Sequence, residues 1–394
     1  MVDLLVKAFI SRPDDWEDPE IRQRYGLLTG GVGIALNLLL SLGKFLAGVL
    51  TGSIAITADA FNNLSDAGSS VVTLAGFQMA AKRADDDHPF GHGRMEYISG
   101  LIVAGAILLV GVELVKSSVE KILRPEEIAF SWASVGILCA AILVKLWMFH
   151  FNRTLGRRIG SAAMGATAAD SLSDAAATSA VLLGTLVGGL TGLHIDGWVG
   201  LLVAAFILRA GWGAARDTLD PLLGQSPDPK LVEDIEQTVL AHELVSGIHD
   251  LIVHDYGPGR RMVSLHAEVP MDADMLAVHD IIDDIERELK EKFRIEAVIH
   301  MDPIATRDPR TNALKEQVAE LVREVDPAMT IHDFRMTAGH DHRNLIFDVV
   351  VPHSCPLTDE EVKSAVAEKA RTLEGGPFYP VISIDRTYTE IPAS

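Results

Sequence analysis

Residues 58–70 read ADAFNNLSDAGSS, and residues 166–179 read ATAADSLSDAAATS. Each stretch places an oxygen-bearing side chain four residues before an aspartate: Asn62 before Asp66, and Asp170 before Asp174. In a helix, a spacing of four puts both side chains on one face, one turn apart. Two such helices facing each other would gather four oxygen ligands around one point. This pattern predicts a tetrahedral divalent-cation site that uses neither cysteine nor histidine.

Both stretches lie in the apolar part of a chain of 394 residues, 48% of which are hydrophobic and 22% charged. A helix needs about 20 mainly apolar residues to cross a bilayer. With a few charges allowed inside, the pattern predicts six transmembrane helices, at residues 26–50, 54–82, 96–119, 130–152, 161–189 and 195–214. A buried core helix is the alternative for any one of these runs. Six runs in succession favour a membrane domain embedded in a lipid bilayer.

The acidic charge lies mainly in the C-terminal part. Residues 1–216 carry 17 basic and 19 acidic side chains, whereas residues 217–394 carry 17 basic and 35 acidic ones. This division predicts a membrane domain at 26–216, after an N-terminal segment at 1–25, followed by water-soluble domains. The net charge of −20 argues against a nucleic-acid partner, because such proteins need basic patches to neutralise phosphates.

Basic residues indicate the orientation in the membrane. They concentrate in the N-terminal segment and in the loops after the second and fourth predicted helices. Because cytoplasmic loops carry an excess of Lys and Arg, both termini are expected in the cytoplasm. The chain is therefore predicted to be a multi-pass protein of the plasma (inner) membrane.

Placing a charged side chain inside a bilayer costs free energy, so such residues usually have a function. The alternative is a structural role, in which these acids cap helix ends or line a water-filled cavity. Two matched pairs that are flanked by Ala, Ser, Leu and Gly disfavour this alternative. Asp59 lies further towards the start of the same helix as Asp66, where it is either a relay carboxylate or a residue at the membrane boundary. Lys44 either pairs with one of the acids or extends to the membrane surface.

The paired residues, the loop HPFGHGRMEY at 88–97, and six predicted spans before an acidic domain resemble the cation diffusion facilitator family over about residues 20–305. The resemblance implies a divalent-metal/proton antiporter that works as a homodimer, and not an enzyme. It places Asn62, Asp66, Asp170 and Asp174 at the intramembrane transport site.

The type of ligand bears on the substrate. Zinc-transporting members of the family typically carry a histidine in the fifth helix and often one in the second, where this chain has Asp170 and Asn62. Imidazole favours zinc, whereas carboxylate and amide oxygens suit manganese. The set is similar to that of the bacterial manganese exporters, so Mn²⁺ is the expected substrate, with Fe²⁺ next. Zn²⁺ stays open because it also accepts carboxylates.

Proton exchange is expected at the same acids. Burial favours the protonated form of a carboxylate, and a bound divalent cation favours the ionised form. Metal arrival should therefore expel protons, and metal release should let them return. We expect one cytoplasmic metal ion to be exchanged for one or more protons from outside.

Further metal sites are expected outside the membrane. The resemblance assigns Asp85, His88 and His92, in the loop after the second helix, as ligands. The alternative is a rigid loop whose histidines bond the backbone. From residue 225 to 305, the pattern helix (229–242), strand (248–256), strand (261–270), helix (276–292), strand (296–302) predicts a ferredoxin-like cytoplasmic metal-binding domain. The resemblance maps five residues of this domain onto zinc ligands at the dimer interface of relatives: His249, His266, His279, His300 and Asp302.

The same order then recurs, with predicted helices at 312–325 and 358–373 and strands at 330–338, 343–352 and 379–388. The tripeptide IHD at 248–250 returns at 331–333, and VP at 269–270 returns at 351–352. This spacing predicts a tandem copy of the ferredoxin-like domain at 310–394. The copy keeps His332 but has Asp348 in place of His266 and Asp385 in place of His300, so its ligands are expected to be degenerate.

Three classes of function remain to be compared. The first is a homodimeric manganese/proton antiporter, with a zinc or iron(II) exporter on the same scaffold as the alternative. The second is a membrane-anchored metal sensor that binds ions without moving them, and it would not need acids in the bilayer. The third, an integral membrane hydrolase, has no nucleophile motif and no HExxH sequence to support it.

Overall fold

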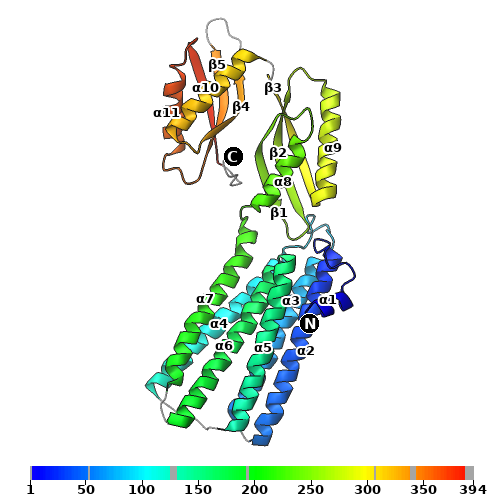
Figure 1. The fold of residues 1–394 in the computed structure, drawn as a ribbon, viewed down its shortest axis with the longest axis vertical. Coiled ribbons are helices and arrows are strands. Elements are labelled where there is room, and N and C mark those ends of the chain that lie inside the picture. Colours follow the sequence, from blue (N-terminus) through cyan, green and yellow to red (C-terminus); the bar gives the residue numbers. More distant parts are fainter. Residues whose placement is uncertain are drawn as a thin grey trace. The chain divides into compact units, whose positions relative to one another are not determined.

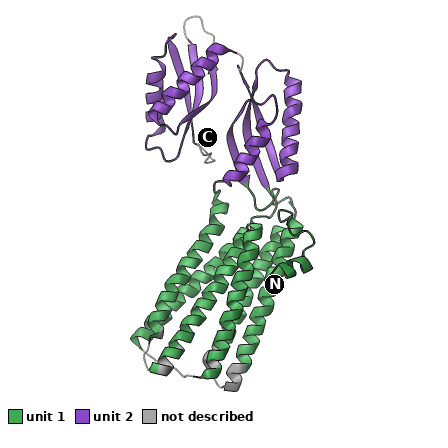
Figure 2. Ribbon diagram, in the orientation of Figure 1, with its two compact units in different colours: residues 1–225, 255–260 green, residues 226–254, 261–394 purple. Residues whose placement is uncertain are grey.

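The computed structural model describes residues 2–51, 54–124, 131–191, 195–305, 308–337 and 343–386. It divides into two compact units (Figure 2). Unit 1 comprises residues 1–225 together with 255–260 and is helical (Figure 1). Unit 2 comprises residues 226–254 and 261–394 and combines helices with two small sheets.

Unit 1 consists of one short helix and a set of long ones. These are α1 (Val2–Phe9), α2 (Pro19–Thr51), α3 (Ile54–Ala80), α4 (Met95–Leu123), α5 (Trp132–Ile159), α6 (Ala162–Thr191) and α7 (Asp196–Leu223). Helix α2 begins at Pro19, earlier than the predicted residue 26, because proline is well suited to the first turn of a helix. Helix α7 runs on to Leu223, beyond the predicted residue 214, and ends at Gly224 in the left-handed conformation. The apolar pattern marks only the apolar part of each helix, so it missed these extensions.

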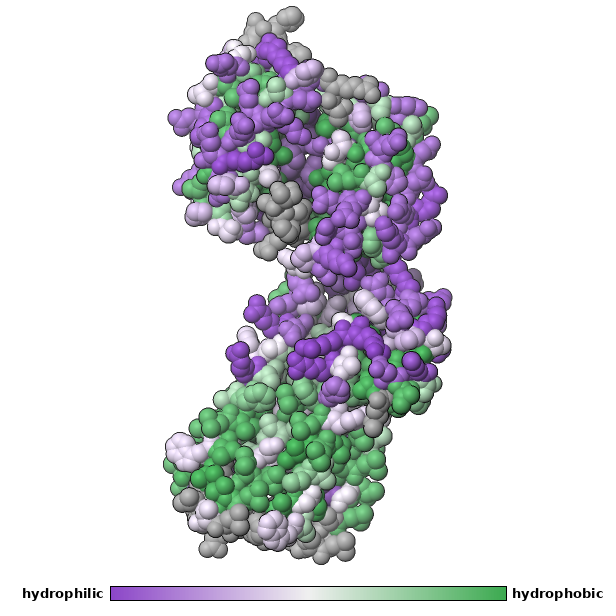
Figure 3. Space-filling view, viewed as in Figure 1, coloured by the Kyte–Doolittle hydropathy of each residue, from purple (hydrophilic) through white to green (hydrophobic). Residues whose placement is uncertain are grey.

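The surface of unit 1 is apolar. Within the described residues, four helices are long and apolar enough to cross a membrane: α2, α4, α5 and α7. Large apolar side chains remain exposed along them, among them Leu39, Leu109, Leu143 and Leu202. Figure 3 shows this apolar surface as a largely green zone over the helices of unit 1, in contrast to the mainly purple surface of unit 2. Helices α3 and α6 are the two that carry the acidic pairs.

Small residues let the helices of unit 1 approach closely. A Cβ atom at Gly26 of α2 would lie 2.3 Å from Cβ of Phe77 in α3, and one at Gly30 would lie 2.8 Å from Leu74. This spacing of small residues is a common device for close packing of membrane helices. The hydroxyls of Thr73 in α3 and Thr167 in α6 lie 2.9 Å apart. Helix α3 is therefore held between α2 and α6.

A buried ion pair joins α2, α4 and the start of α6. Arg22 donates from Nε to Glu96 at 2.6 Å and from Nη2 to the second carboxylate oxygen at 2.8 Å. Ser161 Oγ donates to the same carboxylate at 2.5 Å, and Arg22 also donates to the carbonyl oxygen of Ile159. Glu96 is fully buried. The carboxylate of Glu96 thus links α2, α4 and the start of α6 through hydrogen bonds.

Helix α1 lies within the segment at 1–25, for which we predicted no helix. Its Val2 and Val6 are buried against Ile21 of α2 and Leu155 of α5. The spacing of apolar residues at positions 2, 6 and 10 is helical and would have predicted it. The segment is too short and too charged to resemble a membrane span, so the apolar runs that predict the spans do not include it.

Unit 2 contains two modules with the same order of elements. The first module consists of α8 (Pro229–Leu240), β1 (Gly247–Asp255), β2 (Arg261–Pro270), α9 (Met275–Phe293) and β3 (Ile295–Ile304). Its sheet has the order β1-β2-β3, and β2 and β3 run parallel. Alternate residues of β2, such as Val263 and Leu265, are buried against Ile282 and Ile285 of α9.

The second module consists of α10 (Pro309–Val325), β4 (Thr330–Met336), β5 (Arg343–Val351), α11 (Asp359–Ala370) and β6 (Phe378–Arg386). Its sheet has the order β4-β5-β6, with β5 and β6 parallel. Both modules also share a backbone detail, because Asp250 and Asp333 have positive φ angles of 52° and 50°. An aspartate in the left-handed backbone region is uncommon, and in both modules this aspartate follows the same Ile-His pair.

Candidate metal centres

Asp66 of α3 and Asp174 of α6 come together inside unit 1. The ammonium of Lys145 in α5 donates to Oδ2 of Asp66 at 2.7 Å and to Oδ2 of Asp174 at 2.6 Å. Lys145 is 3% exposed and Asp66 is 8% exposed. The two acids that the sequence assigns to one site are therefore joined across the helices by a buried cation.

The remaining predicted ligands lie one helical turn from these acids. Asp170 is half-buried on α6, and Asn62 is exposed on α3. The next residue, Asn63, is buried and accepts a hydrogen bond from Lys44 at 3.4 Å. Asp59 belongs to α3, in a part whose side chains lie outside the described residues. The structure thus joins one acid from each predicted pair directly.

Lys145 was missed by the sequence analysis, although a signal for it exists. It follows directly on the uncharged run 128–144 and lies within the helix predicted at 130–152. A cation inside a membrane span marks function by the same rule that singled out the acids. A buried carboxylate is costly unless it is paired, and Lys145 is the partner of buried Asp66 and of partly buried Asp174. A divalent cation would compete with the ammonium for the same oxygens.

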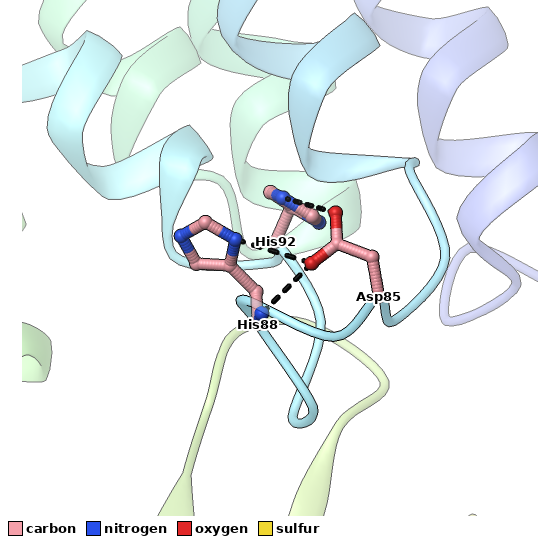
Figure 4. A group of neighbouring side chains, drawn as sticks. All are labelled: Asp85, His88 and His92. Atoms are coloured by element: carbon pink, nitrogen blue, oxygen red, sulfur yellow. Dashed lines mark hydrogen bonds and ion pairs between the residues drawn. The ribbon is translucent and has the colours of Figure 1, made fainter.

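The loop between α3 and α4 brings Asp85, His88 and His92 together (Figure 4). Asp85 Oδ1 lies 3.3 Å from Nδ1 of His88, and Oδ2 lies 3.5 Å from Nε2 of His92. Asp85 also accepts the backbone N–H of His88 at 2.7 Å, and this bond is the main reason that the pKa of Asp85 is lowered. The group offers two imidazoles and a carboxylate, a set that suits zinc or a similar ion.

Residues 255–260, which belong to unit 1, support this loop. Arg94 donates to the carbonyl oxygen of Asp255 at 2.7 Å, and the ring of Phe90 stacks on Tyr256 at 4.4 Å between centroids. The backbone at Gly93 lies so close to Tyr256 that only glycine fits, because a Cβ atom there would lie 2.8 Å from the carbonyl oxygen of Tyr256. These contacts hold the loop that presents the two histidines.

The first module of unit 2 brings three of its five predicted ligands, His249, His266 and His300, around a fourth, Asp302. Oδ2 of this residue lies 2.8 Å from Nδ1 of His266 and 3.2 Å from Nε2 of His249, while Oδ1 lies 3.3 Å from Nε2 of His300. His279 instead lies 3.4 Å from Asp283 on its own helix α9 and is exposed. His249, His266 and Asp302 are close enough to share one ion.

The charges around His249 favour a cation. Burial lowers the pKa of its imidazole, but the hydrogen bond to Asp250 and the nearby carboxylates outweigh burial, so the pKa stands above its ordinary value. The pKa of Asp250 is lowered chiefly by that same hydrogen bond. An imidazole held between carboxylates is stabilised when positive charge arrives, whether as a proton or as a metal ion.

The second module carries a related group that the sequence analysis undervalued. Ligand atoms of His332, Asp348 and Asp385 lie within 4.8 Å of one another. In the first module His266 pairs across the sheet with His300, whereas in the second Asp348 pairs with Ser383. If Asp348 is taken as the counterpart of His266, Ser383 matches His300 and Asp385 matches Asp302. The predicted match of Asp385 with His300 is therefore wrong by two residues.

Two family models and several known proteins match this chain. Residues 32–223 match the cation efflux transmembrane domain, and residues 227–304 match the cytoplasmic domain of cation efflux proteins. An uncharacterized transporter of Methanocaldococcus jannaschii is 31% identical over 272 residues, which cover 69% of this chain and 96% of the relative. The manganese efflux system protein MneS of Bacillus subtilis is 32% identical over 295 residues (72% and 99%). The cation-efflux pump FieF of Salmonella typhi is 28% identical over 297 residues (72% and 95%).

Proposed function

The chain belongs to the cation efflux, or cation diffusion facilitator, family, and from this premise we propose that it exports manganese from the cytoplasm in exchange for protons. The observation that carries the proposal is the convergence of Asp66 and Asp174 on Lys145. One buried and one partly buried carboxylate from different helices, held by one displaceable cation, form a site for a cation of higher charge.

The donor atoms favour manganese over zinc. Asn62, Asp66, Asp170 and Asp174 supply oxygen only, and oxygen ligands suit Mn²⁺. One relative of about 30% identity is named as a manganese efflux protein, and another is named only as a cation-efflux pump. An exporter of iron(II) or zinc on the same scaffold is the alternative, because both ions accept carboxylate ligands.

Proton exchange follows from charge balance at the site. When the metal ion leaves, the carboxylates lose two positive charges in a water-poor environment, and Lys145 can compensate only part of this loss. Protons from the outer side are the available replacement, and an arriving metal ion expels them again. Lys145 thus takes part in the cycle as a tethered cation that occupies the oxygens while no metal is bound.

The whole protein fits this activity as a multi-pass plasma-membrane transporter. In our proposal α2 to α7 are its six spans, the two modules of unit 2 are ferredoxin-like copies in the cytoplasm, and both termini are cytoplasmic. The match of residues 227–304 to the family's cytoplasmic domain supports the first copy, and the repeated order of elements supports the second. We propose a homodimer, as the resemblance implies. A metal sensor without transport is disfavoured by the acids buried within the spans.

The experiment is metal flux in proteoliposomes that enclose a metal-sensitive dye. We expect uptake of Mn²⁺ to exceed that of Fe²⁺ and Zn²⁺, and we expect Asp66→Ala and Asp174→Ala each to abolish it. Glu113→Ala is the matched control, because it removes an exposed acid from α4 of the same unit and should keep the wild-type flux. Wild-type flux in either aspartate variant would refute the site, and preference for zinc would refute the proposed substrate.

A further inference from the structure

His332, on β4 of the second module, is a buried imidazole in an acidic environment. It is 7% exposed, and neither ring nitrogen makes a hydrogen bond within the described part of the chain. Its Nε2 lies 3.2 Å from Oδ2 of Asp385 and 3.6 Å from Oδ1 of Asp250. Buried polar groups in native proteins nearly always have a partner. A histidine buried in this way needs an explanation, and a ligand on Nε2 would provide one.

The surroundings of His332 repeat the arrangement of the first module's metal group. His332 stands where His249 stands, Asp385 where Asp302 stands, and Asp348 where His266 stands. The carboxylate of Asp348 replaces one imidazole, so the group keeps three ligands while its chemistry shifts from nitrogen towards oxygen. The replacement changes the preference among ions and does not remove the site.

Negative charge accumulates at this group. Asp250 from the first module joins Asp348 and Asp385 of the second, and burial together with the other two carboxylates raises the pKa of Asp385. The neighbouring arginines are engaged elsewhere, since Arg386 binds Asp359 and Arg335 binds Asp333. A group of carboxylates around an imidazole, whose two neighbouring arginines bind other acids, is the electrostatic setting of a cation site.

We propose that His332, Asp348 and Asp385 bind a divalent cation, with Asp250 of the first module completing the site. The ligand set of one imidazole and three carboxylates is harder than that of the first module and suits Mn²⁺ or Fe²⁺. The ion lies at the junction of the two modules, because its ligands come from both.

The two groups are joined by a stacked pair of histidines. The rings of His249 and His332 lie 4.2 Å apart at an interplanar angle of 27°. His249 belongs to the first module's group and His332 to the second, so a cation in either group fixes one ring of the stack. Metal binding therefore fastens the tandem modules to each other within one chain. This role concerns the unit 2 modules alone and does not require the chain to transport the ion.

The test is metal stoichiometry of the purified full-length chain at equilibrium, measured with Mn²⁺ after removal of bound metal by a chelator. We expect Asp348→Asn combined with Asp385→Asn to lose one bound equivalent. Glu360→Gln, which removes an exposed acid from the same module, should lose none. Equal stoichiometry in the double variant and the wild type would overturn the proposal and leave an ordinary cluster of ion pairs.

A gain-of-function variant protects the test against misfolding. Asp348→His gives the second module the ligand set of the first, and we expect it to bind Zn²⁺ more tightly while it loses affinity for Mn²⁺. Unchanged affinity for both ions would argue against coordination by residue 348. Both experiments read binding in the absence of a membrane gradient, so their failure would leave the proposed transport untouched.

Discussion

Lys145 is the buried cation of the proposed transport site. It is almost completely buried and bonds one carboxylate from α3 and one from α6. Breaking a buried ion pair on one side leaves an uncompensated charge, which costs about 3–5 kcal/mol of stability. In the proposed transport cycle, the same ammonium competes with an incoming metal ion for these carboxylates. Stability without metal and affinity for metal are therefore opposed at this residue.

Replacing Lys145 should separate its effect on stability from its effect on metal affinity. We predict that Lys145→Met lowers the melting temperature of the metal-free protein, because Asp66 and Asp174 lose their counter-ion, and that it tightens Mn²⁺ binding. Added Mn²⁺ should then raise the melting temperature more than it does in the wild type. Thermal unfolding in detergent with and without Mn²⁺ measures both changes.

Lys116→Met is the control for this prediction. Lys116 lies on α4, is 73% exposed and pairs only loosely with Glu113 at 3.6 Å. Its loss should change neither quantity, because exposed ion pairs contribute little to stability. A Lys145→Met protein with the melting temperature and Mn²⁺ affinity of the wild type would show that the ammonium is not a competitor at the site.

Sequence reasoning at the residue scale works where spacing carries the information. The spacing of four selected Asp66 and Asp174, because helical geometry is local. It could not show that Lys145 reaches both, because that contact depends on how three helices pack. The choice between Asn62, which is exposed, and Asn63, which is buried, depends on the rotation of α3. His279 was grouped with distant histidines, but its partner Asp283 lies one turn away on α9.

At the scale of whole helices, Glu96 connects more elements than any local motif indicated. It accepts bonds from Arg22 of α2 and from Ser161, the residue that precedes α6, while it lies at the start of α4 itself. Ser161 Oγ also accepts the backbone N–H of Met164, which caps the first turn of α6. Glu96 thus fixes the positions of α2, α4 and α6 relative to one another at this end of the helices.

We predict that Glu96→Gln destabilises unit 1 by about 3–5 kcal/mol, because it leaves the guanidinium of Arg22 buried without its carboxylate. Glu113→Gln changes the same residue type on the same helix, but Glu113 is 71% exposed, so its effect should stay below about 1 kcal/mol. Chemical unfolding of the purified protein in detergent measures the difference. Equal midpoints for the two variants would contradict this account of the bundle.

The helices and strands themselves were largely predictable, and their ends were not. Apolar runs locate α2 to α7, and alternation locates strands such as β2 and β5, because each pattern follows from local geometry. The charged ends of the helices, such as the start of α2 and the end of α7, were cut short in the prediction. Helix α1 was missed because its apolar face covers only a few residues. A short amphipathic helix lacks the long apolar run that marks a membrane span.

On the scale of the molecule, apolar and acidic parts are divided between two units. The exposed leucines lie on unit 1, whereas most of the net negative charge belongs to the part of the chain after residue 216. The match to the family's cytoplasmic domain ends at residue 304, so the second module lies outside the part of the chain that matches the family. Its repeated elements were predictable from IHD and VP. The pairing of its ligands was not, because it depends on the register of β5 with β6.

We propose that one site of carboxylates exchanges a divalent metal ion for protons. The most direct test records metal and pH together in proteoliposomes that hold a metal-sensitive dye and a pH-sensitive dye. We predict that Mn²⁺ entry drives protons out of the same vesicles, that an imposed proton gradient accelerates Mn²⁺ movement, and that both signals disappear together in Asp174→Ala. Movement of Mn²⁺ with no accompanying proton flux, or proton flux that persists in Asp174→Ala, would contradict the account.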